Sequence, residues 1–202
     1  MRTALLLFIF IAFHGNANSQ TFSLLKDINA SPSYGYAQSA PMGLLGNNLI
    51  FWANTLTNGM ELWKTDGTAA GTVLLKDIFT GKNSSAHGDW AVMNGWLYFV
   101  ADDGNAGLEL WKTDGTTAGT VMVKDINPGI AFSLPSYLTN INGTLYFYAK
   151  GPSGMGLWKS DGSAAGTLLV KDIELVPWQT FPTAFVAVNG GVYFSARDNS
   201  HG

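Results

Sequence analysis

The stretch ELWKTDGTAAGTVLLKDI, residues 61–78, recurs almost letter for letter further along the chain. The later copies read ELWKTDGTTAGTVMVKDI over residues 109–126 and GLWKSDGSAAGTLLVKDI over residues 156–173. Phe51, Phe99, Phe147 and Phe194 follow the same spacing, at intervals of 48, 48 and 47 residues. A constant period of this length indicates that the chain is built from copies of one supersecondary unit.

Each copy predicts four short strands. A short, largely apolar run such as residues 90–93 comes first, and the Asn-Gly that follows it is the strongest short signal for a two-residue hairpin. The second strand has the form LYFV, and the third is the ELWK segment. An Asp-Gly-Thr turn then leads into a fourth strand of the form VLLK. Bulky residues in continuous runs predict sheets that are covered on both faces.

Four-stranded units of this length are typical of β-propeller blades. We therefore predict an all-β fold, a β-propeller-like array of four-stranded antiparallel blades, in preference to a solenoid or a sandwich. Blades are expected at residues 41–78, 89–126 and 135–173, after a lone fourth strand at residues 20–28 and before a truncated blade at residues 183–202. On this interpretation the array is incomplete at the C-terminus, and the rest of the same chain is expected to supply the missing blades.

The repeated residues resemble those of the bacterial ELWxxDGT-repeat proteins, a secreted family also labelled hyalin-repeat proteins. The matching residues are Glu61-Leu62-Trp63 with Asp66-Gly67-Thr68, Glu109-Leu110-Trp111 with Asp114-Gly115-Thr116, and, more loosely, Leu157-Trp158 with Asp161-Gly162-Ser163. In the third copy Gly156 replaces the glutamate. The resemblance implies secretion, surface display and a propeller-like fold, and it brings no catalytic residues with it.

Residues 1–19 have the pattern of a signal peptide. Arg2 precedes the apolar run 4–13, and Ala17-Asn18-Ser19 supplies small residues for cleavage. This run is too short for a helix that spans a bilayer, which takes about 20 apolar residues. We therefore expect a mature chain of residues 20–202 that is secreted or displayed at the cell surface, with no membrane span.

Charge and motifs exclude several function classes. A net charge of −3 with scattered Lys and Arg provides no cation cluster for a phosphate backbone, which excludes nucleic acid as a partner. The sequence has no HExxH, no Gly-x-Ser-x-Gly and no phosphate-binding glycine loop, so we expect no enzyme. Asp102 and Asp103 would be half of a glycosidase carboxylate pair, which keeps a glycosidase or lyase as the alternative.

Residues shared by every unit serve what every unit needs, which is folding. The motif residues with this structural assignment are Trp63, Asp66, Gly67, Trp111, Asp114, Gly115, Trp158, Asp161 and Gly162. Trp90 aligns with Met42, Leu138 and Phe185, so it is predicted to lie in the core. Calcium needs six to eight oxygens from several carboxylates, whereas each turn offers one aspartate, so a turn-forming Asp is preferred and no metal or cofactor is expected. The repeated Lys-Asp pairs are expected to form ion pairs or hydrogen bonds at blade edges.

Two connections vary between units, namely those from strand two to three and from strand four to the next unit. In a propeller both emerge on one face, which makes that face the expected binding surface. Its candidate ligand-binding residues are Tyr34, Tyr36, His87, Asp102, Asp103, Trp178, Phe181 and Arg197. Exposed aromatics with carboxylates suit a polysaccharide or a protein. We predict a non-catalytic binding or adhesion module; a carbohydrate-active enzyme and a purely structural surface spacer are the alternatives.

Overall fold

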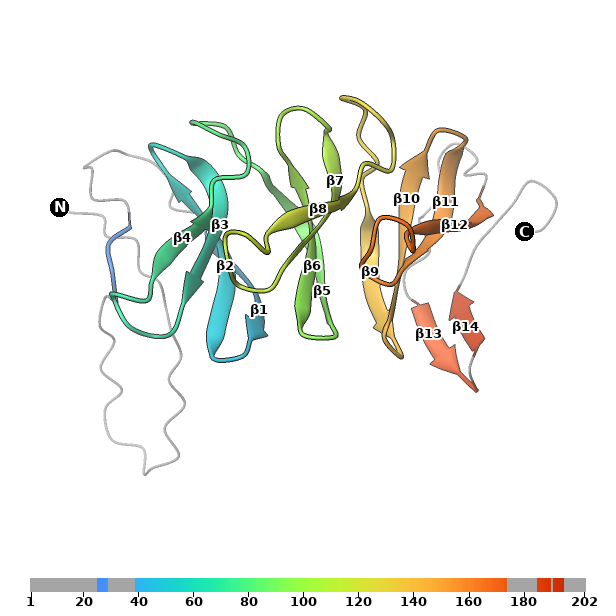
Figure 1. The fold of residues 1–202 in the computed structure, drawn as a ribbon, viewed down its shortest axis with the longest axis horizontal. Helices are drawn as coiled ribbons and strands as arrows, with labels where there is room; N and C mark the ends of the chain where they lie inside the picture. Colours follow the sequence, from blue (N-terminus) through green and yellow to red (C-terminus); the bar gives the residue numbers. More distant parts are fainter. Residues whose placement is uncertain (1–24, 29–38, 174–184, 190, 195–202) are drawn as a thin grey trace. The chain divides into compact units, whose positions relative to one another are not determined.

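The computed structural model describes residues 25–28, 39–173, 185–189 and 191–194 (Figure 1). The chain divides into two compact units, residues 1–84 and residues 85–202. Strands joined by turns and loops make up the described part, and no helix in it is long and apolar enough to cross a membrane. The predicted signal peptide lies outside the described residues.

The first unit contains one four-stranded antiparallel sheet. Its strands are β1 (Ser39–Leu45), β2 (Asn48–Thr55), β3 (Gly59–Thr65) and β4 (Val73–Lys76), each paired with the next along the chain. Residues 25–28 also belong to this unit, because Ile28 packs against the buried side chains of Phe51 and Trp63. The Lys26 ammonium donates a hydrogen bond of 2.7 Å to the carbonyl of Thr72.

The second unit contains two sheets of the same kind and a hairpin. The first consists of β5 (Ala86–Met93), β6 (Trp96–Asp102), β7 (Leu108–Thr113) and β8 (Val121–Lys124). The second consists of β9 (Ser136–Ile141), β10 (Thr144–Gly151), β11 (Gly154–Ser160) and β12 (Leu168–Asp172), and β13 (Phe185–Val188) pairs with β14 (Gly191–Phe194). All pairings are antiparallel, which confirms the predicted all-β, propeller-like array of four-stranded blades.

The Asn-Gly pairs form the tight hairpins that the sequence predicts. Asn94 and Gly95 have φ of 52° and 78°, and Asn142 and Gly143 have φ of 51° and 81°. Positive φ at both central residues is the requirement of a type I′ turn, and Asn and Gly meet it at the lowest steric cost. These turns fix the register so that the repeated aromatics become cross-strand partners, for example Phe99 opposite Trp111.

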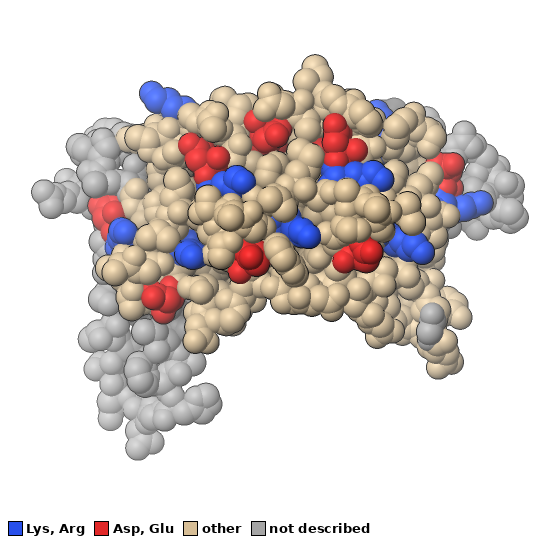
Figure 2. Space-filling model, in the orientation of Figure 1, with Lys and Arg blue, Asp and Glu red and all other residues tan. Residues whose placement is uncertain are grey.

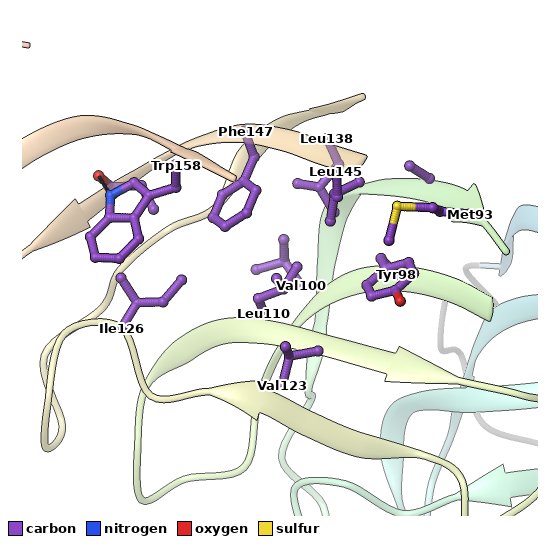
Figure 3. Packing of buried hydrophobic residues seen from close by; sticks show 12 residues of the cluster. Met93, Tyr98, Val100, Leu110, Val123, Ile126, Leu138, Leu145, Phe147 and Trp158 are labelled. Carbon is purple, nitrogen blue, oxygen red and sulfur yellow. Dashed lines mark hydrogen bonds between the residues drawn. The ribbon is translucent and has the colours of Figure 1, made fainter. Parts of the chain in front are cut away.

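Buried side chains join the two four-stranded blades of the second unit. Val100 and Leu110 of the first blade pack in one cluster with Leu145, Phe147 and Trp158 of the next (Figure 3). Such close packing between neighbouring sheets is what allows each unit to bury an apolar face that it cannot bury alone.

The turn glycine at position 162 also serves this packing. A Cβ on Gly162 would lie 2.1 Å from the hydroxyl oxygen of Tyr98, which reaches over from the neighbouring blade. Tyr98 is 2% exposed, and its burial, with a smaller effect of Asp161, raises the pKa of its phenol. The repeat therefore uses this glycine both for its backbone conformation and for space.

Trp90 is not a core residue, contrary to the alignment of the units. It is 40% exposed, whereas Met42 and Leu138 at the aligned positions are 5% and 8% exposed. The irregularity in β5 falls between His87 and Trp90, which puts Trp90 in register opposite Phe99. Met42 and Leu138 instead lie within the irregular part of their own strands. Phe185, the fourth aligned residue, lies opposite Phe194 in the same register as Trp90 and is 6% exposed, so the register alone does not explain the exposure of Trp90.

The expectation that the fourth strands are covered on both faces is wrong for β12. All five of its residues are exposed, whereas Leu75 of β4 and Val123 of β8 are buried. In the following sheet, Phe185 packs in a cluster with Tyr148 and Leu157 of β10 and β11. The described hairpin therefore covers the middle of the third blade and leaves its last strand open to solvent.

Candidate functional site

The Asp-Gly-Thr turns are closed by their own side chains. Asp114 Oδ1 accepts hydrogen bonds from the backbone N–H of Thr116 at 2.8 Å and from its hydroxyl at 2.7 Å. The Thr116 hydroxyl oxygen in turn accepts from the N–H of Gly119 at 2.9 Å. The turns at residues 66–71 and 161–166 repeat the same three bonds. Each aspartate is therefore engaged in forming a turn, the role preferred from the sequence.

The electrostatics of the turns follow from these bonds. The hydroxyl hydrogen bond of Thr68, followed by its backbone N–H, lowers the pKa of Asp66. Ser163 lowers the pKa of Asp161 in the same order. Donors that favour the carboxylate form keep both groups ionised, which holds the turn closed at neutral pH.

The two glycines of the turn have different reasons to be glycine. Gly115 has a φ of 88°, a conformation that other residues rarely adopt. Gly119 has no such backbone requirement, but a Cβ there would lie 2.1 Å from Asp114 Oδ1. The first glycine is needed for its conformation and the second for the space that the carboxylate fills.

Buried hydroxyl pairs explain the last threonine of the motif. The hydroxyl groups of Thr113 and Thr120 lie 2.8 Å apart, and both residues are fully buried. Thr65 with Thr72 and Ser160 with Thr167 form equivalent pairs at 2.7 Å. The motif tryptophans, Trp63, Trp111 and Trp158, are buried as well, with 9%, 6% and 7% exposed. The constant motif is thus built into the scaffold of each blade.

The glutamate of the ELW motif has a role that sequence reasoning missed. Glu109 is fully buried, and its carboxyl group accepts from the N–H of Ile126 at 2.8 Å and from the N–H and hydroxyl of Ser133 at 3.2 and 2.6 Å. Glu61 accepts in the same way from Ile78 and Phe79, at 2.8 and 3.3 Å. Burial raises the pKa of Glu109 to about 7, against the opposing effect of the Ser133 hydrogen bond. The sequence signal for this role is a glutamate that recurs between apolar neighbours in two copies of the motif.

Two lysines of the second blade donate hydrogen bonds to backbone carbonyls of the next blade. Lys124 Nζ donates to the carbonyl of Thr167 at 2.8 Å, which joins the end of β8 to the turn of the next blade. Lys112 Nζ donates to the carbonyl of Gly162 at 2.7 Å and lies 4.5 Å from the ring centre of Trp96. Figure 2 shows lysine and acidic side chains interspersed on the face in view, which does not form a field of one sign.

In the second unit, the variable connections lie together at one edge. The carbonyl of Leu108 at the start of β7 accepts from the backbone N–H of Ser133. The carbonyl of Ser133 accepts from the backbone N–H of Lys150 near the end of β10. The Phe132 ring lies over Gly107, where a Cβ would be 2.6 Å from Cδ1 of the ring. At the other edge, the Asn94 amide donates to the carbonyl of Gly143 and links two hairpin turns. Figure 1 shows these two sets of connections at opposite ends of the strands.

The first unit shows the same association of variable connections. The N–H of Met60 at the start of β3 donates to the hydroxyl of Ser84 at 3.0 Å. The Asn58 amide donates to Asp77 Oδ2 at 2.8 Å, which joins the loop between β2 and β3 to the end of β4. The connections after β2 and after β4 therefore meet within one unit, as the propeller interpretation predicts.

The structure places three of the predicted ligand-binding residues. Asp102 ends β6, and its Oδ1 accepts from Gly104 at 2.7 Å; Asp103 Oδ1 accepts from Asn105 and Ala106, both at 2.9 Å. Both carboxylates thus close their own loop. His87, predicted in a loop, lies instead on β5 opposite Val100, because that strand begins earlier than the apolar run suggests. Tyr34, Tyr36, Trp178, Phe181 and Arg197 lie outside the described residues.

Residues 127–135 of the connection between β8 and β9, here called the β8–β9 loop, expose apolar side chains that the sequence pattern did not indicate. Ile130, Phe132 and Leu134, here called the apolar tip, are 82%, 49% and 42% exposed. Leu134 has a φ of 48°, an unfavourable conformation for a branched side chain. Its N–H donates to the carbonyl of Leu108 at 3.1 Å. A firmly held loop therefore presents a strained, apolar end to solvent.

Within the described ranges, no three His, Asp or Glu side chains gather in a group that would hold a metal ion. The acidic side chains detailed above accept hydrogen bonds within turns, from the backbone or, at Asp77, from the amide of Asn58. The arrangement at the variable edge of the second unit is one of apolar contact area beside carboxylates, which suits recognition by surface contact.

Comparisons with known proteins give little further guidance. A scan against protein-family models finds no match, and a search of the curated proteins finds none either. Among solved structures, the chain is similar to an α-L-arabinofuranosidase, CtGH43, from Clostridium thermocellum, with a TM-score of 0.35 and 16% identity. The match covers 80% of this chain and 61% of that enzyme's chain, so it leaves more than a third of the enzyme unmatched. A likeness of this size carries no argument about activity.

Proposed function

We propose that the protein is a non-catalytic binding or adhesion module, secreted or held at the cell surface, that engages a polysaccharide or a protein through its variable connections. Export follows from the predicted signal peptide at residues 1–19 and from the resemblance to the ELWxxDGT-repeat proteins. The variable edge of the second unit, residues 102–107 and 127–135, is the contact surface of this proposal.

The observation that carries the proposal is the contrast between the constant motif and the variable loop. Motif side chains such as Asp114, Thr116 and Glu109 are engaged in hydrogen bonds within the scaffold. The loop between β8 and β9 is also well hydrogen-bonded, yet it exposes the apolar tip. Apolar side chains gathered on a fixed loop are unfavourable in water and are characteristic of contact surfaces.

The test is binding of the full secreted chain to a panel of immobilised polysaccharides and immobilised proteins. The variant Ile130→Ser/Phe132→Ser removes most of the apolar tip. The matched control is Leu44→Ser, because Leu44 is an equally apolar residue, 66% exposed, beside a hairpin turn of the first unit. We expect saturable binding to a member of the panel, weakened at least about tenfold by the tip variant and unchanged by the control.

Three results would count against the proposal. Equal binding by the tip variant and the wild type would remove this edge as the contact surface. Release of new reducing ends from a polysaccharide of the panel would favour the glycosidase alternative. A chain that folds but shows no saturable binding to any member of the panel would favour a structural spacer.

A further inference from the structure

We infer that Glu109 is a positioning residue: its buried carboxyl group fixes the β8–β9 loop in the conformation that presents the apolar tip. A glutamate that two of the three motif copies share would then control the variable surface beside it. The description of the tip as a contact surface rests on the proposed function, whereas the fixing of the loop does not.

The carboxyl group of Glu109 ties the two ends of the loop together. Glu109 lies on β7 opposite Ala101 and has no accessible surface. It accepts from Ile126, just before the loop, at 2.8 Å, and from the N–H and hydroxyl of Ser133, near the loop's end, at 3.2 and 2.6 Å. Removing the carboxyl group would take this acceptor from the buried N–H of Ile126 and would leave the N–H and hydroxyl of Ser133 with the carbonyl of Leu108 alone, to which both also donate at 3.1 Å.

Backbone hydrogen bonds of Ser133 and Leu134 hold the apolar tip in place. The backbone N–H groups of Ser133 and Leu134 both donate to the carbonyl of Leu108 at 3.1 Å. The carbonyl of Ser133 accepts from the backbone N–H of Lys150 at 2.7 Å. Within the loop, the Asn127 amide donates to the carbonyl of Phe132 at 3.3 Å. The positive φ of Leu134 persists because its neighbours hold it from several sides. Without the Glu109 carboxyl group, Ser133 keeps only its bonds to Leu108 and Lys150, so we expect Leu134 to relax more often and the apolar tip to become more mobile.

The third blade shows that the glutamate is not required to form a blade. Gly156 stands at the equivalent position, and β9 to β12 nevertheless make the same four-stranded sheet. A Cβ on Gly156 would lie 2.4 Å from Cδ1 of Leu169. In the third blade, the leucine side chain therefore occupies the space beside position 156. Folding alone therefore does not explain the buried carboxyl group, and positioning of the following connection does.

Amide hydrogen exchange of the full chain tests this inference directly. In Glu109→Ala we expect the amides of Ser133, Leu134 and Lys150 to exchange about 10- to 100-fold faster than in the wild type. Glu109→Gln should rescue part of the protection, because its amide oxygen still accepts a hydrogen bond. The matched control is Glu61→Ala, which should speed exchange at Ile78 and Phe79 and leave the β8–β9 loop unchanged.

A second substitution separates positioning from general stability. If Glu109 acts through Ser133, then Glu109→Ala should add little to the exchange rates of Leu134 in a Ser133→Ala background. Unchanged loop exchange in Glu109→Ala would overturn the inference. So would a loss of protection spread evenly over β6 and β7, because that result means a merely structural role.

Binding distinguishes this inference from the proposed function. Suppose Glu109→Ala frees the loop and binding to the panel persists at full strength. Positioning then stands, and the apolar tip is not the contact surface. If the amides of the β8–β9 loop exchange at the same rate in Glu109→Ala as in the wild type, the positioning role of Glu109 is refuted, whatever the binding assay shows.

Discussion

Replacing Gly119 by alanine tests the physical account of the repeated turn. The backbone at Gly119 is compatible with alanine, so the substitution acts through space alone. The new Cβ would lie 2.1, 2.3 and 2.4 Å from Oδ1, Cγ and Oδ2 of Asp114, whereas non-bonded carbon atoms prefer about 3.5–4.0 Å. The whole carboxylate must therefore move by about 1 Å or more, which breaks its two hydrogen bonds to Thr116.

The expected loss of stability follows from those two bonds. Breaking them destabilises the turn by about 2–3 kcal/mol, and the lower entropy of alanine in the unfolded chain offsets about 0.4–1 kcal/mol of this loss. We expect a net decrease of about 1–2 kcal/mol in the free energy of unfolding, measured by urea denaturation with tryptophan fluorescence. In a chain of this size, that is a fall in Tm of roughly 2–8 °C.

A double-mutant cycle decides whether the clash is the cause. In an Asp114→Ala background the carboxylate is absent, so Gly119→Ala should become neutral or slightly stabilising. Gly115→Ala is the control, because Gly115 has open space around it and a φ of 88°. Its strain of about 1–2 kcal/mol should be the same in both backgrounds. An equal effect of Gly119→Ala with and without Asp114 would refute the steric explanation.

Three further outcomes are expected from the same assay. Thr113→Val should decrease the unfolding free energy by about 1–3 kcal/mol, because it removes two hydrogen bonds of the buried Thr113 hydroxyl, to the hydroxyl of Thr120 and from the N–H of Gly115, and the double change to valine should cost less than the sum. The pKa of Glu109 is raised to about 7 from its ordinary value of 4.5, so the folded state binds the proton more tightly. Its contribution to stability is therefore fully present below about pH 4.5 and lost as the pH rises through 7, and a pH series of wild type minus Glu109→Gln should show this decline. Lys124→Met should weaken the second unit by about 1 kcal/mol with no dependence on salt, because its partner is the carbonyl of Thr167 and not a carboxylate.

The repeat predicted the fold because its signals are local. Asn94-Gly95 and Asn142-Gly143 specify hairpins through their own backbone preferences, and the Asp-Gly-Thr turns are closed by bonds within six residues. The fixed spacing then made Phe99 and Trp111 partners, along with their counterparts in the other blades. Local chemistry repeated at one period needs no knowledge of distant contacts to be interpreted.

Burial at individual positions could not be predicted in this way. Trp90 aligns with the buried residues Met42, Leu138 and Phe185, yet it is 40% exposed. Residues of β12 repeat the pattern of buried strands but lie open, because the cover of a fourth strand comes from a neighbouring sheet. Alignment of units compares sequence positions, and burial depends on what packs against them.

By itself, the sequence determined the four-stranded unit, its turns and the division into constant and variable parts, because each depends on residues close along the chain. The tertiary structure alone decided what the motif glutamate does and which variable residues are exposed. The carboxyl group of Glu109 accepts from Ser133, 24 positions away in the sequence, and the loop that carries the apolar tip is held by the carbonyl of Leu108 in β7. Such contacts depend on where the blade brings distant segments together, which no local pattern encodes.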